Sequence, residues 1–388
     1  MNRFDVIVLG LGAAGSATLY QLAKRGVNVL GIDRYSPPHA QGSTHGDTRV
    51  TRLAIGEGAH YTPLAQRSHQ LWRELEAATG TELLTENGGL IMSSGSDAKT
   101  FHGTAFFATT VAAARRHAIP HELLDAAEIR RRFPQFAIDD STRGYFEPSA
   151  GFVRPEACIR AELAEAKKYG ASIRLHEPAE KIEQSGSTVH VTTAKGRYAA
   201  ERLVVAAGPW LVQLLPELAP HFKVYRQVLY WFDVEAHFAQ FAPEKFPIFI
   251  WELPGEGRGI YGFPAIDGAK GGFKVSTEQY LQPTTPETVA RDVTPDETAR
   301  TYRELVAPHI RGVAANCVKA TTCLYTVTRD FGFVIDSHPD LNRIIIASPC
   351  SGHGFKHSAA LGEAIGDLAV GEKSRFDLSA FTLSRFTQ

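Results

Sequence analysis

The stretch FDVIVLGLGAAGSATLYQLAKRG (residues 4–26) decides the fold of this chain. Its first seven residues are a short apolar run, which is typical of a buried parallel strand. A helix is expected from about Ala13 to Arg25, because Gly26 supplies a common stop signal. The next apolar run, VNVLGID, is expected to be a strand that ends at Asp33. The order strand, turn, helix, strand predicts a βαβ unit at the start of the chain.

Three glycines stand at the expected turn between the first strand and the helix. Gly10, Gly12 and Gly15 have the spacing G-x-G-x-x-G. Gly10 is expected to make the turn, Gly12 to let a pyrophosphate approach the backbone, and Gly15 to let helix and strand pack closely. The phosphates would lie at the helix N-terminus, and Asp33 would accept a hydrogen bond from a ribose hydroxyl. The motif predicts a dinucleotide cofactor, either NAD or FAD.

A second glycine-rich loop near the end of the chain favours FAD. The stretch SGHGFKHSAALGEAIGDLA (residues 351–369) places Gly352 and Gly354 before another expected helix. A flavin needs a second contact of this kind, because its isoalloxazine ring lies far from its adenine. A helix N-terminus beside that ring would stabilise negative charge on the reduced flavin.

The composition narrows the class of protein. A chain of 388 residues is long enough for two domains, and a formal net charge of -1 gives no broad field toward nucleic acid or an acidic membrane. No stretch is long and apolar enough to predict a membrane span. The 4 cysteines are irregularly spaced and predict neither a disulfide framework nor a metal site. Reduced thiols fit a cytoplasmic protein.

The texture of the chain predicts two interleaved domains. Strand-to-glycine and helical patterns occur at the beginning, middle and end, with helices expected over about 61–79, 102–117 and 154–170. From about 216 to 316, aromatic and β-branched residues alternate with turn residues, which indicates an antiparallel sheet. The expected fold is α/β: an FAD-binding Rossmann-like domain interleaved with a second α+β domain built on an antiparallel sheet. The expected ranges are 1–85, 150–215 and 322–388 for the FAD-binding domain, and 86–149 and 216–321 for the substrate domain.

Five short stretches resemble one known family along essentially the whole chain. They are GSTHGDTR (42–49), YGFP (261–264), CLYT (323–326), FVID (333–336) and SGHGFK (351–356). Their types and order resemble the monomeric sarcosine oxidase and N-methyltryptophan oxidase family. These proteins are FAD-dependent amine oxidases with the D-amino-acid oxidase type of fold.

The resemblance implies how the cofactor is held. Cys323 matches a cysteine that bonds covalently to the 8-methyl group of FAD. The expected cofactor-binding residues are Gly10, Gly12, Gly15, Asp33, Arg34, Ser43, Cys323, Gly352, Gly354 and Lys356.

The resemblance also implies the catalytic and substrate-binding residues. His45 and Arg49 match a pair beside the flavin ring, and Tyr261 matches an aromatic residue of the substrate pocket. Lys274 matches a lysine implicated in oxygen activation, where an ammonium can stabilise the negative charge that develops on O2. Arg52 and Lys356 match two cations that hold the substrate carboxylate, and such a pair binds a carboxylate strongly in a dry pocket.

Two positions depart from the family pattern. Glu278 stands where sarcosine oxidases carry a histidine, and the more distant fructosyl-amine oxidases have a glutamate there that contacts the sugar-derived part of the substrate. Ile55 stands where a tyrosine is common. Both departures concern the group on the substrate nitrogen, and Glu278 is expected to contact the substrate.

The expected function is oxidation of an N-alkyl amino acid, such as sarcosine or N-methyltryptophan, to an imine. Water would hydrolyse the imine to an aldehyde and an amino acid, while O2 is reduced to H2O2. One alternative is a fructosyl-amino-acid oxidase with the same chemistry, which Glu278 favours. A second is a flavin dehydrogenase that uses another electron acceptor. The family resemblance implies a monomer.

Overall fold

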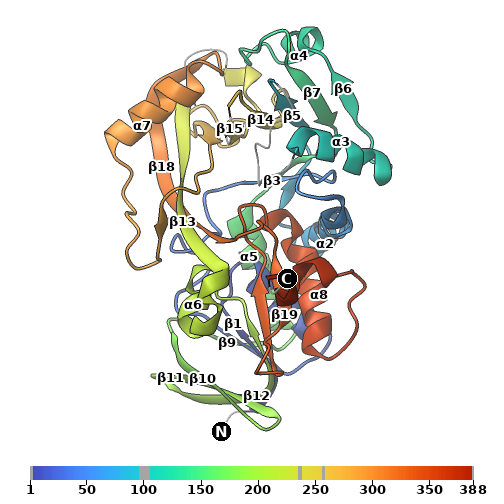
Figure 1. Ribbon diagram of the computed structural model, residues 1–388, viewed down its shortest axis with the longest axis vertical. Coiled ribbons are helices and arrows are strands. Elements are labelled where there is room, and N and C mark those ends of the chain that lie inside the picture. Colours follow the sequence, from blue (N-terminus) through green and yellow to red (C-terminus); the bar gives the residue numbers. More distant parts are fainter. Residues whose placement is uncertain (1–2, 96–104, 235–237, 256–257, 387–388) are drawn as a thin grey trace.

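The computed structural model of the chain describes residues 3–95, 105–234, 238–255 and 258–386. Figure 1 shows an elongated molecule with one large sheet in its lower half and another in its upper half. The α/β fold class with a Rossmann-like sheet and a separate, mainly antiparallel sheet is confirmed. Within the described ranges, no helix combines the length and apolar character needed to cross a bilayer.

The lower sheet has a parallel centre made by the βαβ unit. Its main path runs β10-β11-β12-β1-β2-β9, and β20 pairs with β12 and with β19. Strand β1 pairs in parallel with β2 on one side and β12 on the other. The strands are β1 (Arg3–Leu9), β2 (Val29–Ile32), β9 (Ser172–Arg174), β10 (Ala179–Ser185), β11 (Thr188–Thr193), β12 (Gly196–Val205), β19 (Val334–Ser337) and β20 (Ile344–Ser348).

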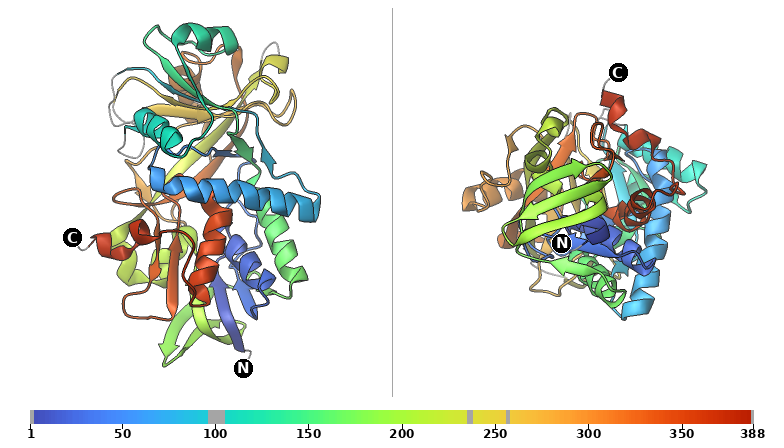
Figure 2. Two further views of the ribbon diagram at one scale, coloured as in Figure 1. Left: turned by 90° about the vertical axis from the view of Figure 1, so that its right-hand side faces the viewer. Right: turned by 90° about the horizontal axis from the view of Figure 1, so that it is seen from below.

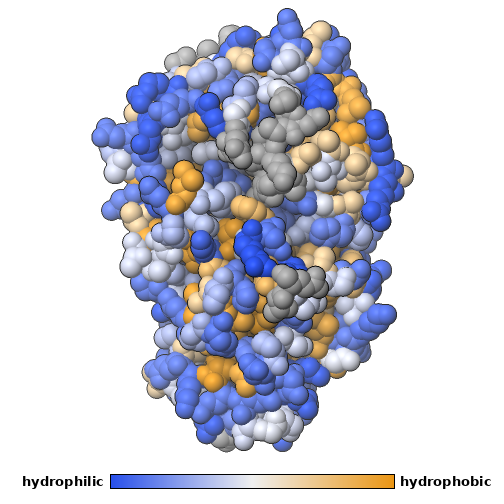
Figure 3. All heavy atoms as spheres, in the orientation of Figure 1, coloured by the Kyte–Doolittle hydropathy of each residue, from blue (hydrophilic) through white to orange (hydrophobic). Residues whose placement is uncertain are grey.

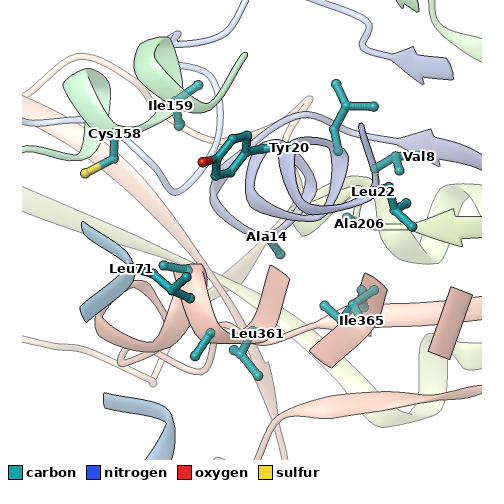
Figure 4. Close-up of a cluster of buried hydrophobic side chains, with 14 of the residues drawn as sticks. Val8, Ala14, Tyr20, Leu22, Leu71, Cys158, Ile159, Ala206, Leu361 and Ile365 are labelled. Atoms are coloured by element: carbon teal, nitrogen blue, oxygen red, sulfur yellow. The ribbon is translucent and has the colours of Figure 1, made fainter. Parts of the chain in front are cut away.

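Four helices surround one large apolar core beside this sheet. They are α1 (Ala13–Lys24), α2 (Thr62–Thr79), α5 (Pro155–Lys168) and α8 (Ser358–Ala369). Helix α1 packs against both α5 and α8. Figure 4 shows their side chains converging, with Tyr20 of α1 near Ile159 of α5, and Leu361 of α8 below Ala14. Figure 2 shows α2 lying across the middle of the molecule, between the two halves.

The glycine motif acts sterically as predicted. Gly10 has a φ of 89°, in the left-handed region that favours glycine. A Cβ on Gly15 would lie only 1.8 Å from the carbonyl oxygen of Gly10, so no larger residue fits where α1 leaves β1. The α1–α8 crossing is also close, since a Cβ on Gly362 would lie 2.5 Å from the Cβ of Ala17.

The upper sheet is mainly antiparallel, in the order β17-β13-β16-β15-β14-β5-β7-β6, with β18 paired to β13. One pair, β14 with β5, is parallel. The strands are β5 (Gly89–Ser93), β6 (Glu122–Leu124), β7 (Arg143–Glu147), β13 (Phe222–Val234), β14 (Ile248–Glu252), β15 (Gly259–Gly262), β16 (Phe273–Ser276), β17 (Pro283–Thr284) and β18 (Val313–Thr328). A small sheet of β3 (Arg49–Thr51), β8 (Gly151–Val153) and β4 (Leu84–Thr85) lies where the halves meet.

The remaining α-helices of the described residues are α3 (Phe106–Arg116), α4 (Ala126–Arg132), α6 (Leu211–Leu214) and α7 (Pro295–Thr301), and a π-helical turn at Tyr302–Val306 follows α7. The predicted helices 61–79 and 154–170 are confirmed to within two residues at each end, and α3 confirms the third, whose residues 102–104 lie outside the described ranges. The antiparallel sheet expected from about 216 to 316 is confirmed, and it is interrupted at 295–306, where Thr294 accepts a hydrogen bond from Glu297 N and starts α7.

The domain boundaries stay a prediction. The boundary expected between 321 and 322 falls inside β18, which is continuous from Val313 to Thr328.

On the face in Figure 3, the hydrophobic residues among those coloured lie in small separate groups on a mostly hydrophilic surface.

Candidate active site

Two adjoining cavities contain most of the predicted site residues. The larger, of about 410 Å³, is lined by Gly10, Gly12, Asp33, Arg34, Ser43, Gly352 and Gly354. The smaller, of about 80 Å³, is lined by Arg52, Tyr261, Lys274, Glu278 and Lys356. Arg49 lines both, which joins the expected cofactor and substrate regions. Three described residues of the predicted set, Gly15, His45 and Cys323, are outside the lining of either cavity.

Asp33 holds the turn that carries the glycine motif. Its two carboxylate oxygens accept hydrogen bonds from Leu11 N at 2.8 Å and from Tyr35 N at 2.7 Å. Burial raises the pKa of this carboxyl, while the two backbone N–H groups oppose that shift. Each carboxylate oxygen keeps a further acceptor position, so a ribose hydroxyl can still bind there.

The larger cavity fits FAD. Helix α1 begins beside it with no side-chain cap and no acidic residue in its first turn, which leaves N–H groups for a pyrophosphate. A Cβ on Gly12 would meet nothing closer than 3.9 Å, so this backbone is open to a close-lying group. Among the described residues, the buried hydroxyls of Ser43 and Ser348 line the cavity without a hydrogen-bond partner. A ligand with phosphate and ring oxygens would satisfy them.

The Cys323 thiol lies between a backbone carbonyl and a guanidinium. Its Sγ is 3.3 Å from Ser43 O and 3.7 Å from the terminal nitrogen of Arg49. Burial raises the pKa of this thiol, and Arg49 opposes that shift by favouring the thiolate. A second thiol, Cys350, lines the large cavity directly, and sequence reasoning assigned it no role at the cofactor.

The two predicted carboxylate-binding cations share a carboxylate that the sequence analysis missed. Glu57 Oε2 lies 2.7 Å from Arg52, and its Oε1 lies 3.1 Å from Lys356 Nζ. The three side chains are at most 5% exposed. Burial lowers the pKa of Lys356 to about 8, which Glu57 opposes and Arg52 reinforces. The sequence signal for this pairing is weak: Glu57 stands between two glycines, five residues after Arg52.

Lys274 is held in a pocket of carbonyls and rings. Its Nζ donates to Gly46 O at 2.7 Å, to Thr48 O at 3.0 Å and to Thr48 Oγ1 at 3.1 Å. It also lies 4.6 Å from the ring centroid of Phe263 and 5.1 Å from that of Trp231. Burial and the nearby Arg49 lower the pKa of this ammonium well below its ordinary value.

His45 is buried beside these cations. Its Nε2 has no hydrogen-bond partner in the part of the chain that the structure describes. Burial, Arg49 and Lys274 together lower the pKa of His45 to about 3. The imidazole is therefore neutral near pH 7.

Two tyrosines, Tyr261 and Tyr325, and the carboxylate of Glu278 also line the small cavity, with Tyr280 behind Glu278. Tyr261 Oη lies 3.3 Å from Tyr325 Oη, and Tyr280 Oη donates to Glu278 at 2.7 Å. Burial, then the Glu278 charge, raises the pKa of Tyr261. Sequence reasoning assigned no role to Tyr325, although it belongs to the quoted stretch CLYT. The small cavity thus has four cationic side chains and two carboxylates, which favours an anionic group in its ligand.

The comparisons with known proteins agree with this architecture. The family described as FAD dependent oxidoreductase matches residues 5–368. A monomeric sarcosine oxidase from Streptomyces avermitilis is 40% identical over 368 residues, covering 95% of this chain and 94% of that protein. An N-methyl-L-tryptophan oxidase from Escherichia coli is 34% identical over 387 residues, covering 99% of this chain and 100% of that protein.

A solved structure of similar fold is NikD, described as an unusual amino acid oxidase essential for nikkomycin biosynthesis, in its open form. It has a TM-score of 0.83 and 24% identity, and the match covers 98% of each chain. At this identity the likeness concerns the fold. The family match and the close relatives together establish that the chain belongs to the FAD dependent oxidoreductase family, in the group of the monomeric sarcosine oxidases and N-methyl-L-tryptophan oxidases.

Proposed function

We propose that this protein, an FAD-dependent amine oxidase, acts on an N-alkyl α-amino acid, most simply an N-methyl amino acid, with O2 as electron acceptor. One observation carries the choice of substrate class: Arg52 and Lys356 converge on a single carboxylate, that of Glu57. Two buried cations in this arrangement form a site for a carboxylate. The printed functions of the sarcosine and N-methyl-L-tryptophan oxidases support the same class.

Substrate binding would begin at these two cations. The carboxylate of the amino acid would replace that of Glu57 on Arg52 and Lys356, and so bring its N-alkyl group toward Tyr261 and the larger cavity. Apolar side chains such as Phe106 and Ile250 also line the small cavity and would contact the N-alkyl group. A substrate held with this orientation gains much of its rate from positioning.

FAD in the larger cavity would supply the chemistry, accepting two electrons from the substrate and passing them to O2. Gly10, Gly12 and Gly352 would hold it through their backbone, with Asp33, Arg34 and Ser43 contacting its polar groups. Neutral His45 and cationic Arg49 would lie beside the ring. Because positioning and electrostatics suffice for the reaction of an unprotonated amine, we expect the substrate to react in that form.

The Lys274 ammonium would act in the reaction with O2. It is held by three acceptors inside a dry region, where its charge would stabilise the negative charge that develops on oxygen. Replacement of Lys274 by Met is expected to slow reoxidation at least about 100-fold, the usual effect of losing one such group. Undiminished reaction with O2 would instead favour a dehydrogenase with another acceptor.

We also propose that FAD is attached covalently through Cys323. The neighbouring guanidinium of Arg49, 3.7 Å from Sγ, supports the thiolate that such attachment requires. Acid precipitation of the purified protein tests this directly, because covalent flavin stays yellow in the pellet. A colourless pellet would contradict the attachment but leave the oxidase function in place.

Glu278 supports a second candidate substrate class. Its carboxylate lines the small cavity and could accept hydrogen bonds from hydroxyl groups of a substituent on the substrate nitrogen, as in a fructosyl amino acid. A cytoplasmic location, which the 4 free cysteines support, and a monomeric state, which the family resemblance implies, remain part of the proposal. Size-exclusion chromatography with light scattering would test the oligomeric state.

The deciding experiment compares H2O2 release from sarcosine, N-methyltryptophan and fructosyl-glycine. Each is paired with the corresponding amine that lacks the carboxylate. The proposal expects turnover of an N-methyl amino acid and at least about a tenfold loss of kcat/KM without the carboxylate. Turnover of fructosyl-glycine alone would select the second candidate, and no H2O2 from any N-alkyl amino acid would refute the leading proposal.

A further inference from the structure

One short turn carries every hydrogen-bond acceptor of the Lys274 ammonium within the described residues. The turn consists of Gly46, Asp47 and Thr48, and it supplies two carbonyl oxygens and one hydroxyl. Its backbone is unusual, since Gly46 has a φ of 95° and Asp47 a φ of 70°. A non-glycine residue in this region persists only where its surroundings hold it. The position of Lys274 therefore depends on whatever holds the turn.

Glu156 holds the turn from the side of the FAD-binding sheet. It stands in the first turn of helix α5, and one of its carboxylate oxygens accepts from Gly46 N at 2.6 Å and from Asp47 N at 3.2 Å. The Gly46 carbonyl accepts from Lys274 Nζ and also from Thr48 N at 2.8 Å, so the same oxygen closes the turn and holds the lysine. The negative charge of Glu156 also favours the charged form of Lys274.

Lys319 holds the turn from the protein surface. Its Nζ lies 2.5 Å from Asp47 Oδ2, and its side chain is 46% exposed. The same Nζ lies 4.5 Å from the ring centroid of Trp231, whose ring also lies 5.1 Å from Lys274 Nζ.

The strand register explains this arrangement. On β13, Trp231 is directly opposite Lys274 of β16 on one side and directly opposite Lys319 of β18 on the other. Residues opposite one another in a sheet project from the same face, so the indole stands between the two ammonium groups. Each contact is a cation–π interaction. Lys274 is thereby placed at the small cavity and Lys319 at the protein surface.

We propose that Glu156 and Lys319 are positioning residues that hold the turn of Gly46, Asp47 and Thr48, and thereby place the Lys274 ammonium for the reaction with O2. This inference rests on the proposed role of Lys274. Neither Glu156 nor Lys319, both described residues, is part of the lining of the two cavities. Their replacement should therefore slow reoxidation of the flavin and leave its reduction by substrate nearly unchanged.

The test measures the two half-reactions separately by stopped-flow absorbance. Glu156→Gln is expected to slow reoxidation by O2 about tenfold, because it removes the negative charge from the acceptor of two N–H groups. Lys319→Met is expected to slow it about threefold at low salt, and the exposed ion pair makes this effect shrink as ionic strength rises. Anaerobic reduction should stay within about twofold in both variants, and Lys274→Met gives the full loss for reference.

The far end of helix α5 offers matched controls. Lys168 Nζ lies 2.5 Å from Glu165 Oε1, the same distance as in the Lys319–Asp47 pair. Lys168→Met and Glu165→Gln therefore remove a similar pair from the same protein, away from the turn. Both should reoxidise at the wild-type rate.

A second readout does not depend on turnover. Reductive methylation followed by peptide mass spectrometry reports how accessible the Lys274 amine is. Loosening of the turn in Glu156→Gln should accelerate methylation of Lys274, and the control variants should not.

Every outcome of these measurements either supports or overturns the inference. Wild-type reoxidation and methylation rates in both Glu156→Gln and Lys319→Met would overturn the inference, whereas equal slowing of both half-reactions would indicate a general structural defect and overturn it as well. Dithionite reduces the flavin without substrate, so reoxidation is measured even if no N-alkyl amino acid is oxidised. A Lys274→Met protein that reoxidises normally would refute the lysine's proposed role, and the inference with it.

Discussion

Lys356 gives the substrate site a pH dependence that can be measured. Its Nζ lies 3.1 Å from Glu57 Oε1 and donates to His353 O at 2.8 Å, and burial lowers its pKa to about 8. Below that pH the group is an ammonium and attracts the substrate carboxylate. Above it the charge is lost, so KM for an N-alkyl amino acid, relative to KM for an N-alkyl amine without a carboxylate, should rise as pH increases through about 8.

Replacement of Lys356 by Met removes both the charge and its titration. A hydrogen bond to a charged group contributes about 1.5–3 kcal/mol, and about 1.4 kcal/mol corresponds to a factor of ten, so KM at pH 7 should rise roughly 10- to 150-fold. The rise of KM near pH 8 should vanish in this variant. Arg52 still pairs with Glu57 at 2.7 Å, so the fold should survive the change.

The assay measures H2O2 release at several substrate concentrations. It covers about pH 6.5 to about pH 9.5, a range that extends roughly 1.5 units to either side of the Lys356 pKa of about 8. Lys356→Arg keeps a charge that does not titrate in this range and should lose the KM rise while binding more tightly than the Met variant. An N-alkyl amine without a carboxylate serves as the control substrate, and Lys168→Met as the control protein. The reasoning is refuted if Lys356→Met keeps a wild-type KM or still shows the rise near pH 8.

Three further predictions concern stability, the flavin link and the glycine turn. Burial raises the pKa of Glu162 to about 8 from an ordinary value of 4.5, so wild-type stability should fall as pH increases between these values. The free energy of unfolding of Glu162→Gln, relative to that of the wild type, should therefore increase by on the order of 4 kcal/mol between pH 5 and pH 8. Urea unfolding measures this difference, and the same difference at both pH values would contradict the prediction. Cys323→Ser should lose the acid-stable flavin that Cys350→Ser retains, and yellow pellets from both would show that the attachment lies elsewhere. Gly15→Ala should fail to retain flavin, because its Cβ would lie 1.8 Å from the carbonyl oxygen of Gly10. Gly366→Ala should bind flavin normally, because its Cβ would lie 3.8 Å from the nearest atoms, those of the Arg25 side chain. Flavin absorbance at equal protein concentration distinguishes the two variants.

Much of the cofactor half could be predicted because its signals are local. A turn that requires glycine, a helix that starts beside it and an apolar strand each depend on residues a few positions apart. Gly10, Gly15 and Asp33 accordingly lie where their spacing predicted. Helix α7 was missed even though its signal is also local: Thr294 and Glu297 have the spacing of a capping box, and Pro295 occupies the first helical position.

The sequence by itself determined the α/β fold class, the FAD-binding motif and the family, along with the residue types available for the site. Only the tertiary structure decided which of them meet. Glu57 and Lys356 are 299 positions apart, and Lys274 is 226 positions from Thr48, yet each pair is in direct contact. Such contacts depend on the register of distant strands and on how deeply each charge is buried, and neither quantity is expressed in the spacing of neighbouring residues.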